Sequence, residues 1–204
     1  TVPTYRPDLV REDDLAEEVG RILGYDRIPA SAPKGNNLCG GIGRREQFTR
    51  SLRQASIACG WQECCTATLV DDEACAALGF DATARLANPM SREIDVARPS
   101  LLPGLADAVR RNVRQGRAGL GLFEEGPVFA MSDGVPVHER RWAVAMLGPM
   151  TSPSWTGKPV DADFFRLKGA LDAILDELGI DAARYLPTSR PGLHPGRTAS
   201  IVLN

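Results

Sequence analysis

The sequence of 204 residues predicts an α+β fold in which helices flank a mainly antiparallel sheet. Segments with apolar residues at helical spacing alternate with shorter segments that are typical of strands. Two of those strands, predicted over 119–131 and 140–150, are joined by the turn Ser132-Asp133-Gly134. No strand is followed by GxGxxG or GxxxxGK[ST], the glycine turns that cradle phosphates in parallel α/β folds. The pattern therefore favours α+β.

The elements follow one another without an internal repeat. The first helix is predicted after Arg11, with Asp13 and Asp14 as candidate N-cap residues and Gly24 as its end. The further helices are predicted over 44–59, 71–80, 101–114 and 161–180, and the further strands over 61–70, 82–89 and within the segment from Arg184 onward. The helix over 44–59 should bury Phe48 and Leu52. The small, polar and glycine-rich segment 30–43 is predicted to be a linker.

Composition limits the functional classes. The formal net charge of −2 argues against broad electrostatic binding of nucleic acid, although a local basic patch remains compatible with it. No apolar stretch reaches the length of about 18 residues that a membrane span needs, and the sequence contains no recognisable signal peptide. The five cysteines form no CxxC pair, and an odd number of them is typical of free thiols in a reducing compartment.

Acidic residues gather near the start of the first helix. Asp14, Glu17 and Glu18 have the spacing that places carboxylates on one helix face, and Asp8 precedes them on an extended segment. An all-oxygen set of this kind suits a hard cation such as magnesium. The same residues are also typical of a solvated helix start that complements the helix dipole. From spacing alone both interpretations stay open.

The other polar constellations carry less chemistry. Neither His138 nor His194 belongs to a nucleophile signature such as GxSxG, so an independent hydrolase is not indicated. Several arginines lie between Asn88 and Gly119 without interleaved aromatic residues, which indicates a solvated face rather than a stacking platform for RNA. These arginines are Arg92, Arg98, Arg110, Arg111, Arg114 and Arg117. They motivate a nucleic-acid-binding module as the alternative function.

Three ordered stretches of the chain resemble the bacterial phenylalanyl-tRNA synthetase beta subunit. The segment 88–129 contains the pattern NPxSxE, RxSLLPGL and LFExGxVF. Segment 14–30 (DLAEEVGRILGYDRIPA) is similar to the end of the family's B5 domain, and FFRLKGALDAIL with LHPGRTASI resembles its later core. The residues that carry the central match are Asn88, Pro89, Ser91, Glu93, Arg98, Ser100, Leu101, Leu102, Pro103, Gly104, Leu105, Asn112, Leu122, Phe123, Glu124, Gly126, Val128 and Phe129.

The resemblance implies a fold and an assembly. Residues 1–36 would be the last part of a winged-helix-like B5 domain with its linker, and residues 37–204 a non-catalytic core, truncated at its C-terminus, with the antiparallel sheet of class II aminoacyl-tRNA synthetases. The family is a cytoplasmic enzyme of two alpha and two beta subunits that joins phenylalanine to its tRNA using ATP. The alpha subunit carries the active site. The predicted helix over 44–59 would pack at the subunit interface through Phe48 and Leu52.

The resemblance also assigns roles to single residues. Asp8, Asp14, Glu17 and Glu18 match the family's ligands for a magnesium ion that is shared with the alpha subunit. Class II catalytic domains carry an ATP-binding arginine just after the strand that LFEEGPVF resembles, where this chain has Ala130. The resemblance therefore implies no catalytic residue and no nucleotide clamp in this chain. Pro99, where relatives commonly have threonine, is a second departure.

Overall fold

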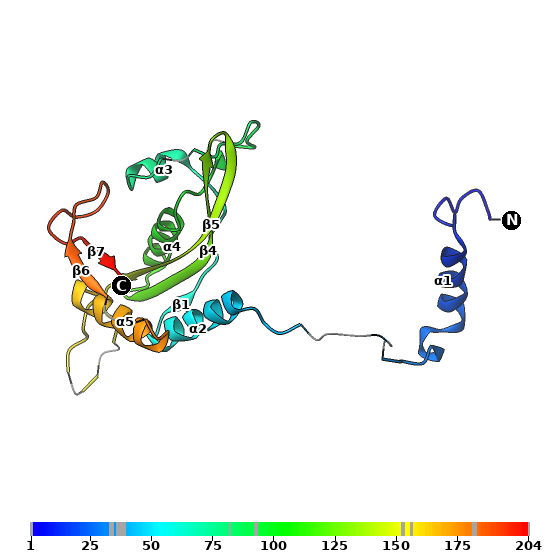
Figure 1. Cartoon of the computed structure of the whole chain (residues 1–204), viewed down its shortest axis with the longest axis horizontal. Helices are drawn as coiled ribbons and strands as arrows, with labels where there is room; N and C mark the ends of the chain where they lie inside the picture. Colours follow the sequence, from blue (N-terminus) through cyan, green and yellow to red (C-terminus); the bar gives the residue numbers. More distant parts are fainter. Residues whose placement is uncertain are drawn as a thin grey trace. The chain divides into compact units, whose positions relative to one another are not determined.

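A computed structural model describes residues 2–32, 35, 40–81, 83–91, 94–151, 154–155, 157–180 and 183–203. The chain divides into two compact units, Thr1–Gly41 and Ile42–Asn204, and each is described by itself (Figure 1). Residues 36 and 37, between which the sequence predicts the domain boundary, lie outside the described residues.

The first unit consists of helix α1 (Glu12–Leu23) and the 3₁₀ turn η1 (Tyr25–Arg27). The helix begins at Glu12 with Arg11 as its N-cap, so the prediction of Asp13 or Asp14 as N-cap is wrong. Asp14 instead lies in the first turn, where its carboxylate accepts backbone N–H bonds from Val10 and Arg11. The helix ends at Gly24 as predicted, in a conformation with φ of 89° that glycine adopts without strain.

The second unit contains the sheet and its flanking helices. In chain order the elements are α2 (Arg44–Ala58), β1 (Gln62–Glu63), β2 (Leu69–Val70), α3 (Asp72–Ala77), β3 (Val96–Ala97), α4 (Leu102–Arg114), β4 (Leu120–Ser132), β5 (Val135–Leu147), α5 (Phe164–Glu177), β6 (Arg184–Pro187) and β7 (Ala199–Val202).

The central sheet has the strand order β1-β4-β5, with β1 parallel and β5 antiparallel to β4. The β4–β5 hairpin pairs without interruption from Leu120↔Leu147 to Ser132↔Val135. Asp133 and Gly134 turn the chain with φ of 51° and 76°, the left-handed geometry that matches the strand twist. This antiparallel hairpin, which is the largest element of the sheet, confirms the predicted fold class.

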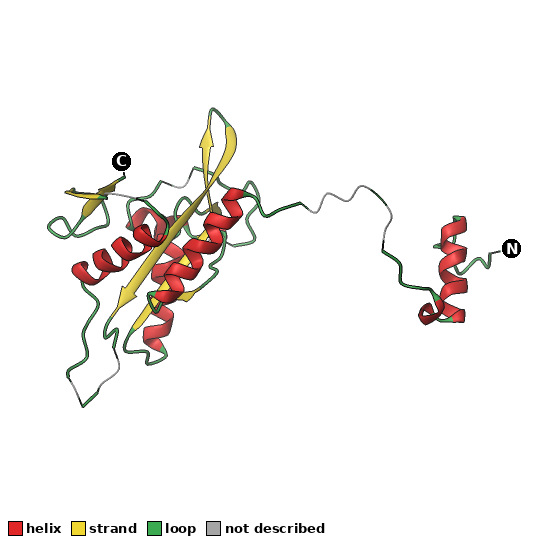
Figure 2. Ribbon diagram, turned by 60° about the horizontal axis from the view of Figure 1, so that its bottom comes forward, coloured by secondary structure: helices red, strands yellow, loops and turns green. Residues whose placement is uncertain are grey.

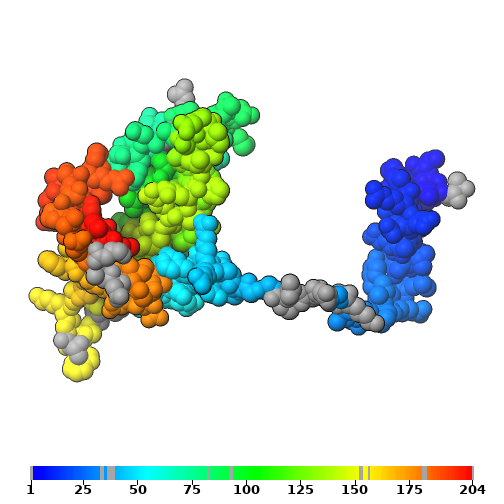
Figure 3. All heavy atoms as spheres, viewed as in Figure 1, coloured from blue at the N-terminus to red at the C-terminus, as the bar shows by residue number. Residues whose placement is uncertain are grey.

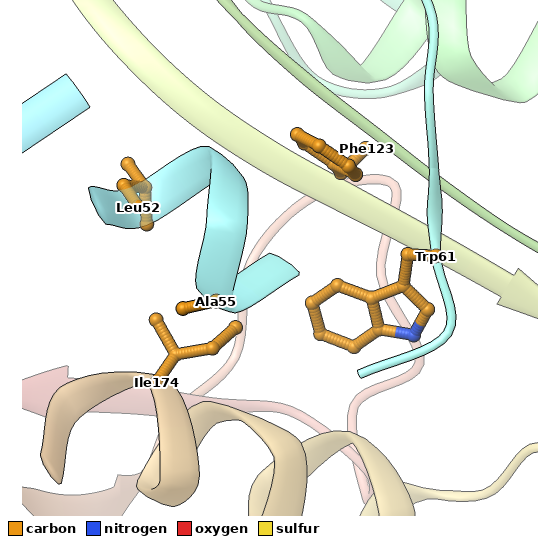
Figure 4. Packing of buried hydrophobic residues seen from close by; sticks show 5 residues of the cluster. All are labelled: Leu52, Ala55, Trp61, Phe123 and Ile174. Carbon is orange, nitrogen blue, oxygen red and sulfur yellow. The ribbon is translucent and has the colours of Figure 1, made fainter. Parts of the chain in front are cut away.

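Alternation along the hairpin explains why helices cover both of its faces. Leu122 and Val128 point toward α4, where they pack against Leu101 and Leu105. Phe123, one position along, points to the opposite face. There it joins Leu52 and Ala55 of α2, Ile174 of α5, and Trp61 (Figure 4). Figure 2 shows the helices lying along the hairpin, and in Figure 3 the surface of α5 (orange) lies against that of α2 (cyan).

Some strands differ from the prediction. Strand β5 begins at Val135 rather than at 140. The prediction missed its first residues because Val135 to Arg141 are exposed and lack the apolar alternation that marks a half-buried strand. The predicted strand over 61–70 forms only the two short strands β1 and β2. Among the described residues of the predicted strand over 82–89, only Arg85 forms a bridge, to Val96.

Candidate functional site

A buried ion pair lies at the centre of the segment that carries the resemblance. Nη1 of Arg98 lies 2.6 Å from Oε1 of Glu124, and both side chains are 4% exposed. Arg98 follows β3, and Glu124 lies on the α4 face of β4. The guanidinium also donates to the carbonyl oxygen of Pro127 at 2.9 Å and to the hydroxyl of Thr66 at 3.1 Å. Arg98 therefore holds three chain segments together.

Thr66 and Gly126 complete this cluster. The hydroxyl of Thr66 donates to the second carboxylate oxygen of Glu124 at 2.7 Å, and its backbone N–H donates to the first at 3.2 Å. A Cβ atom on Gly126 would lie 2.6 Å from Nη2 of Arg98. The arginine, glutamate and glycine of the pattern RxSLLPGL…LFExG thus meet at one buried point. Because Arg98 is bound to Glu124, Thr66 and Pro127 inside the protein, the cluster has a structural role.

The arginines of the predicted solvated face therefore divide into two groups. Arg98 is 3% exposed, so its assignment to a solvated face is wrong. Arg110 and Arg111 are exposed and pair with Asp107 one turn earlier on α4, while Arg114 and Arg117 are exposed near its end. Arg92 lies outside the described residues.

Two apolar residues of helix α2, Leu52 and Phe48, differ in their exposure to solvent. Leu52 is 9% exposed and packs in the core, so its side chain is not available to a partner. Phe48, predicted to face inward, is 47% exposed. Of the two residues predicted for the subunit interface, only Phe48 is therefore exposed. Ile57 is 49% exposed and lies about 180° around the helix from Phe48 by the helical period.

A cavity of about 640 Å³ lies between the first half of α2 and the outer half of the β4–β5 hairpin. Phe129 and His138 line it, with their ring centroids 6.2 Å apart. Glu125, whose side chain is 5% exposed, pairs with both Arg140 and Arg53 at its wall. The hydrogen bond from Arg140 lowers the pKa of Glu125, and burial opposes the shift. Two arginines of this wall thus share one buried carboxylate.

The predicted metal ligands are only partly brought together. Nη2 of Arg6 lies 2.7 Å from Oδ2 of Asp8 and 2.7 Å from Oε1 of Glu18. Arg21 binds the other carboxylate oxygen of Glu18 at 2.5 Å. The hydrogen bonds from Arg6 and then Arg21 lower the pKa of Glu18 to about 2, so that carboxylate is charged at neutral pH.

The remaining two acids do not join this pair. The Oδ2 atom of Asp14 accepts from two backbone N–H groups at 2.6 and 2.8 Å, and Glu17 is exposed. In the part of the chain that the structure describes, no three His, Cys, Asp or Glu side chains are close enough to hold a metal ion together. As arranged in this chain, the four acids do not fit a magnesium site, since a guanidinium stands where two of them converge.

Other residues singled out by the sequence have local roles. Ala130 is an exposed residue of β4 opposite Val137, so no guanidinium projects from that position. The Nδ1 atom of His194 accepts from the backbone N–H of Gly196 at 3.1 Å within a turn. Cys59, Cys64, Cys65 and Cys75 are free thiols, and Cys39 lies outside the described residues. No described helix is long and apolar enough to cross a membrane.

The fold matches class II aminoacyl-tRNA synthetases. The pyrrolysyl-tRNA synthetase PylSc of Desulfitobacterium hafniense superimposes with a TM-score of 0.54 at 18% identity, over 72% of this chain and 49% of that one. A histidine–tRNA ligase subunit of Alicyclobacillus acidocaldarius does so with a TM-score of 0.54 at 13% identity, over 78% and 46%. At these identities the likeness establishes the fold alone. The chain thus has the architecture of a class II synthetase core.

The chain belongs to the phenylalanyl-tRNA synthetase beta chain family. The family model "Phenylalanyl tRNA synthetase beta chain CLM domain" matches residues 28–204, and "tRNA synthetase B5 domain" matches residues 1–25. The phenylalanine–tRNA ligase beta subunit of Bacillus subtilis is 35% identical over the whole chain, and that of Syntrophotalea carbinolica is 32% identical over 98% of it. The chain spans 26% of the length of these relatives.

Sequence reasoning missed the buried Arg98–Glu124 pair. It placed Arg98 among exposed arginines because these residues are close in sequence. A usable signal was present, since Arg98, Glu124 and Gly126 all belong to the same matched pattern, and a buried charge requires a partner of opposite sign.

Proposed function

We propose that this chain is a non-catalytic, assembly-forming region of the beta subunit of a phenylalanine–tRNA ligase. With an alpha subunit, in an assembly of two alpha and two beta chains, the whole enzyme would attach phenylalanine to tRNA(Phe) in the cytoplasm using ATP. The observation that carries the proposal is the match to beta subunits over the full chain, in two family models arranged in order. Residues 1–36 would belong to the B5 domain and its linker, and residues 37–204 to the core.

We propose that the chain is not catalytic because of the residue at position 130. Ala130 stands on β4 where a catalytic class II domain would place an arginine on the ATP phosphate. A methyl group cannot stabilise the charge that develops during adenylate formation. The buried Arg98 does not substitute for it, because its guanidinium is already bound to Glu124, Thr66 and Pro127. The chain would supply a scaffold on which the alpha subunit acts.

In this proposal a magnesium ion binds only in the assembled enzyme. Asp8, Asp14, Glu17 and Glu18 would bind magnesium only beside the alpha subunit, since in this chain Asp14 is engaged by the backbone and Arg6 bridges two of the others. All four donors are oxygen atoms, as magnesium prefers. Isothermal titration of the chain alone should detect no tight magnesium binding. Tight binding by the chain alone would refute this part.

The proposed partner surface is the part of α2 around Phe48 that the core leaves uncovered. A phenylalanine side chain that is 47% exposed is an apolar anchor of the kind found at interfaces. The alternative, a nucleic-acid-binding module, is not favoured. Arg98 is buried, and Arg110 and Arg111 are already paired with Asp107.

The test is co-purification with an alpha subunit of a related ligase. The unaltered chain should form a complex, and Phe48→Asp should abolish it without lowering the thermal stability of the free chain, because the residue lies outside the core. Ile57→Asp is the matched control, since Ile57 is similarly exposed on the other side of the same helix, and it should leave the complex intact. No complex with the unaltered chain, or equal losses for both variants, would contradict the proposed interface.

A further inference from the structure

Two carboxylates of the first unit converge on one nitrogen atom. Asp8 lies on the extended segment before α1 and Glu18 lies within α1, yet Nη2 of Arg6 is 2.7 Å from an oxygen of each. Nε of Arg6 donates to Asp8 as well, at 3.0 Å. The Arg6 guanidinium therefore bridges residues ten positions apart and fixes the distance between them.

We infer that Arg6 occupies the cation position between Asp8 and Glu18, and that a divalent ion binds these two residues only after Arg6 has released both. The inference rests on the proposed metal site. Arg6 is not among the four predicted ligands. Its position between Asp8 and Glu18 is the physical reason why those ligands do not form a metal site in this structure.

Two cations cannot share this position. Magnesium takes oxygen ligands at about 2.0–2.1 Å, so an ion between the two carboxylates would overlap the volume that Nη2 fills. The positive guanidinium would in addition repel a doubly charged ion at close range. Arg6 holds Asp8 and Glu18 near each other without a metal ion. Because it fills the space between them, it also excludes a metal ion from that space.

Arg21 provides an internal comparison. It also binds Glu18, through Oε2, but it makes no contact with Asp8. Removal of either arginine takes one positive charge away from Glu18, whereas only removal of Arg6 opens the position between the two acids. The two substitutions therefore separate a general charge effect from release of the bridge.

The experiment measures binding of Mn²⁺ alone, by electron paramagnetic resonance of the free ion, to the whole 204-residue chain. Arg6→Gln should raise the affinity about threefold to tenfold, the range that one or two exposed ion pairs correspond to. Arg21→Gln should give a smaller gain. Arg27→Gln, which alters an exposed arginine of η1, should give none. An unchanged or weaker affinity for Arg6→Gln, or gains of equal size for Arg6→Gln and Arg21→Gln, would overturn the inference.

A second measurement needs no substitution. The Nε–H signal of Arg6 and the carboxyl signals of Asp8 and Glu18 can be followed by nuclear magnetic resonance while magnesium is added to the unaltered chain. The Arg6 signal should move toward that of a free guanidinium in step with the carboxyl signals. Carboxyl signals that shift while the Arg6 signal stays unchanged would overturn the inference. Neither measurement depends on complex formation with an alpha subunit, so failure here is distinct from failure of the proposed function.

Discussion

Nη1 of Arg98 lies 2.6 Å from Oε1 of Glu124, and this buried pair joins the segment before α4 to the central strand of the sheet. Desolvation of two charges is unfavourable, and their geometry offsets it through further hydrogen bonds to Thr66 and Pro127. The pair thus makes the matched pattern around 88–129 a structural signature.

Removal of one partner of this pair should be strongly destabilising. Glu124→Gln leaves Arg98 buried without a counter-charge and should lower the free energy of unfolding by about 3–5 kcal/mol. Denaturant unfolding followed by tryptophan fluorescence measures it, because Trp61 is 3% exposed in the core. The double variant Arg98→Met with Glu124→Met should lose less free energy of unfolding than Arg98→Met alone and Glu124→Met alone lose together. An additive double variant would show that the two residues do not interact.

Gly126 should not tolerate a side chain while Arg98 is fixed. A Cβ atom there would lie 2.6 Å from Nη2 of Arg98, whose hydrogen bonds prevent it from moving aside. Gly126→Ala should therefore lower the free energy of unfolding by about 1–3 kcal/mol. Gly169→Ala is the control, because its Cβ atom would meet nothing within 4 Å in helix α5, and it should stabilise by about 0.5–1 kcal/mol. Equal effects of the two substitutions would contradict the close approach.

The carboxyl group of Glu18 should titrate well below its ordinary range. Arg6 and Arg21 lower its pKa from 4.5 to about 2, so its ion pairs persist above the ordinary value and are lost only as the pH falls through about 2. Carbon-detected magnetic resonance of the side chain measures the midpoint. Arg6→Gln should raise it. A midpoint near 4.5 in the unaltered chain would show that the bridge does not form in solution.

The thiols should differ in reactivity. Cys75 is fully buried, and burial, followed by the charge of Asp72, raises its pKa to about 11, whereas Cys65 is exposed. Because the thiolate is the reactive form, iodoacetamide at pH 8 should modify Cys65 well before Cys75. Mass spectrometry of the digested chain resolves the two sites. Modification of Cys75 as fast as Cys65 would mean that α3 opens readily.

Much of the fold could be predicted from the sequence, because its helices and the β4–β5 hairpin carry strong periodicity and clear turn residues. The first half of β5 escaped prediction, since an exposed strand has no apolar alternation to reveal it. The inward orientation of Phe48 was predicted from spacing and is wrong, because the core covers only part of that helix. The ion pairs of Arg6 and Arg98 depend on contacts between segments distant in sequence, which spacing within one segment cannot encode.

The most direct test of the central claim is phenylalanine-dependent exchange of pyrophosphate into ATP. The claim is that this chain contributes structure to a phenylalanine–tRNA ligase and has no catalytic centre of its own. The purified chain should give no exchange above the protein-free background at any concentration. Exchange that rises in proportion to the concentration of the chain, and that disappears when the tagged chain is removed from the preparation, would contradict the claim.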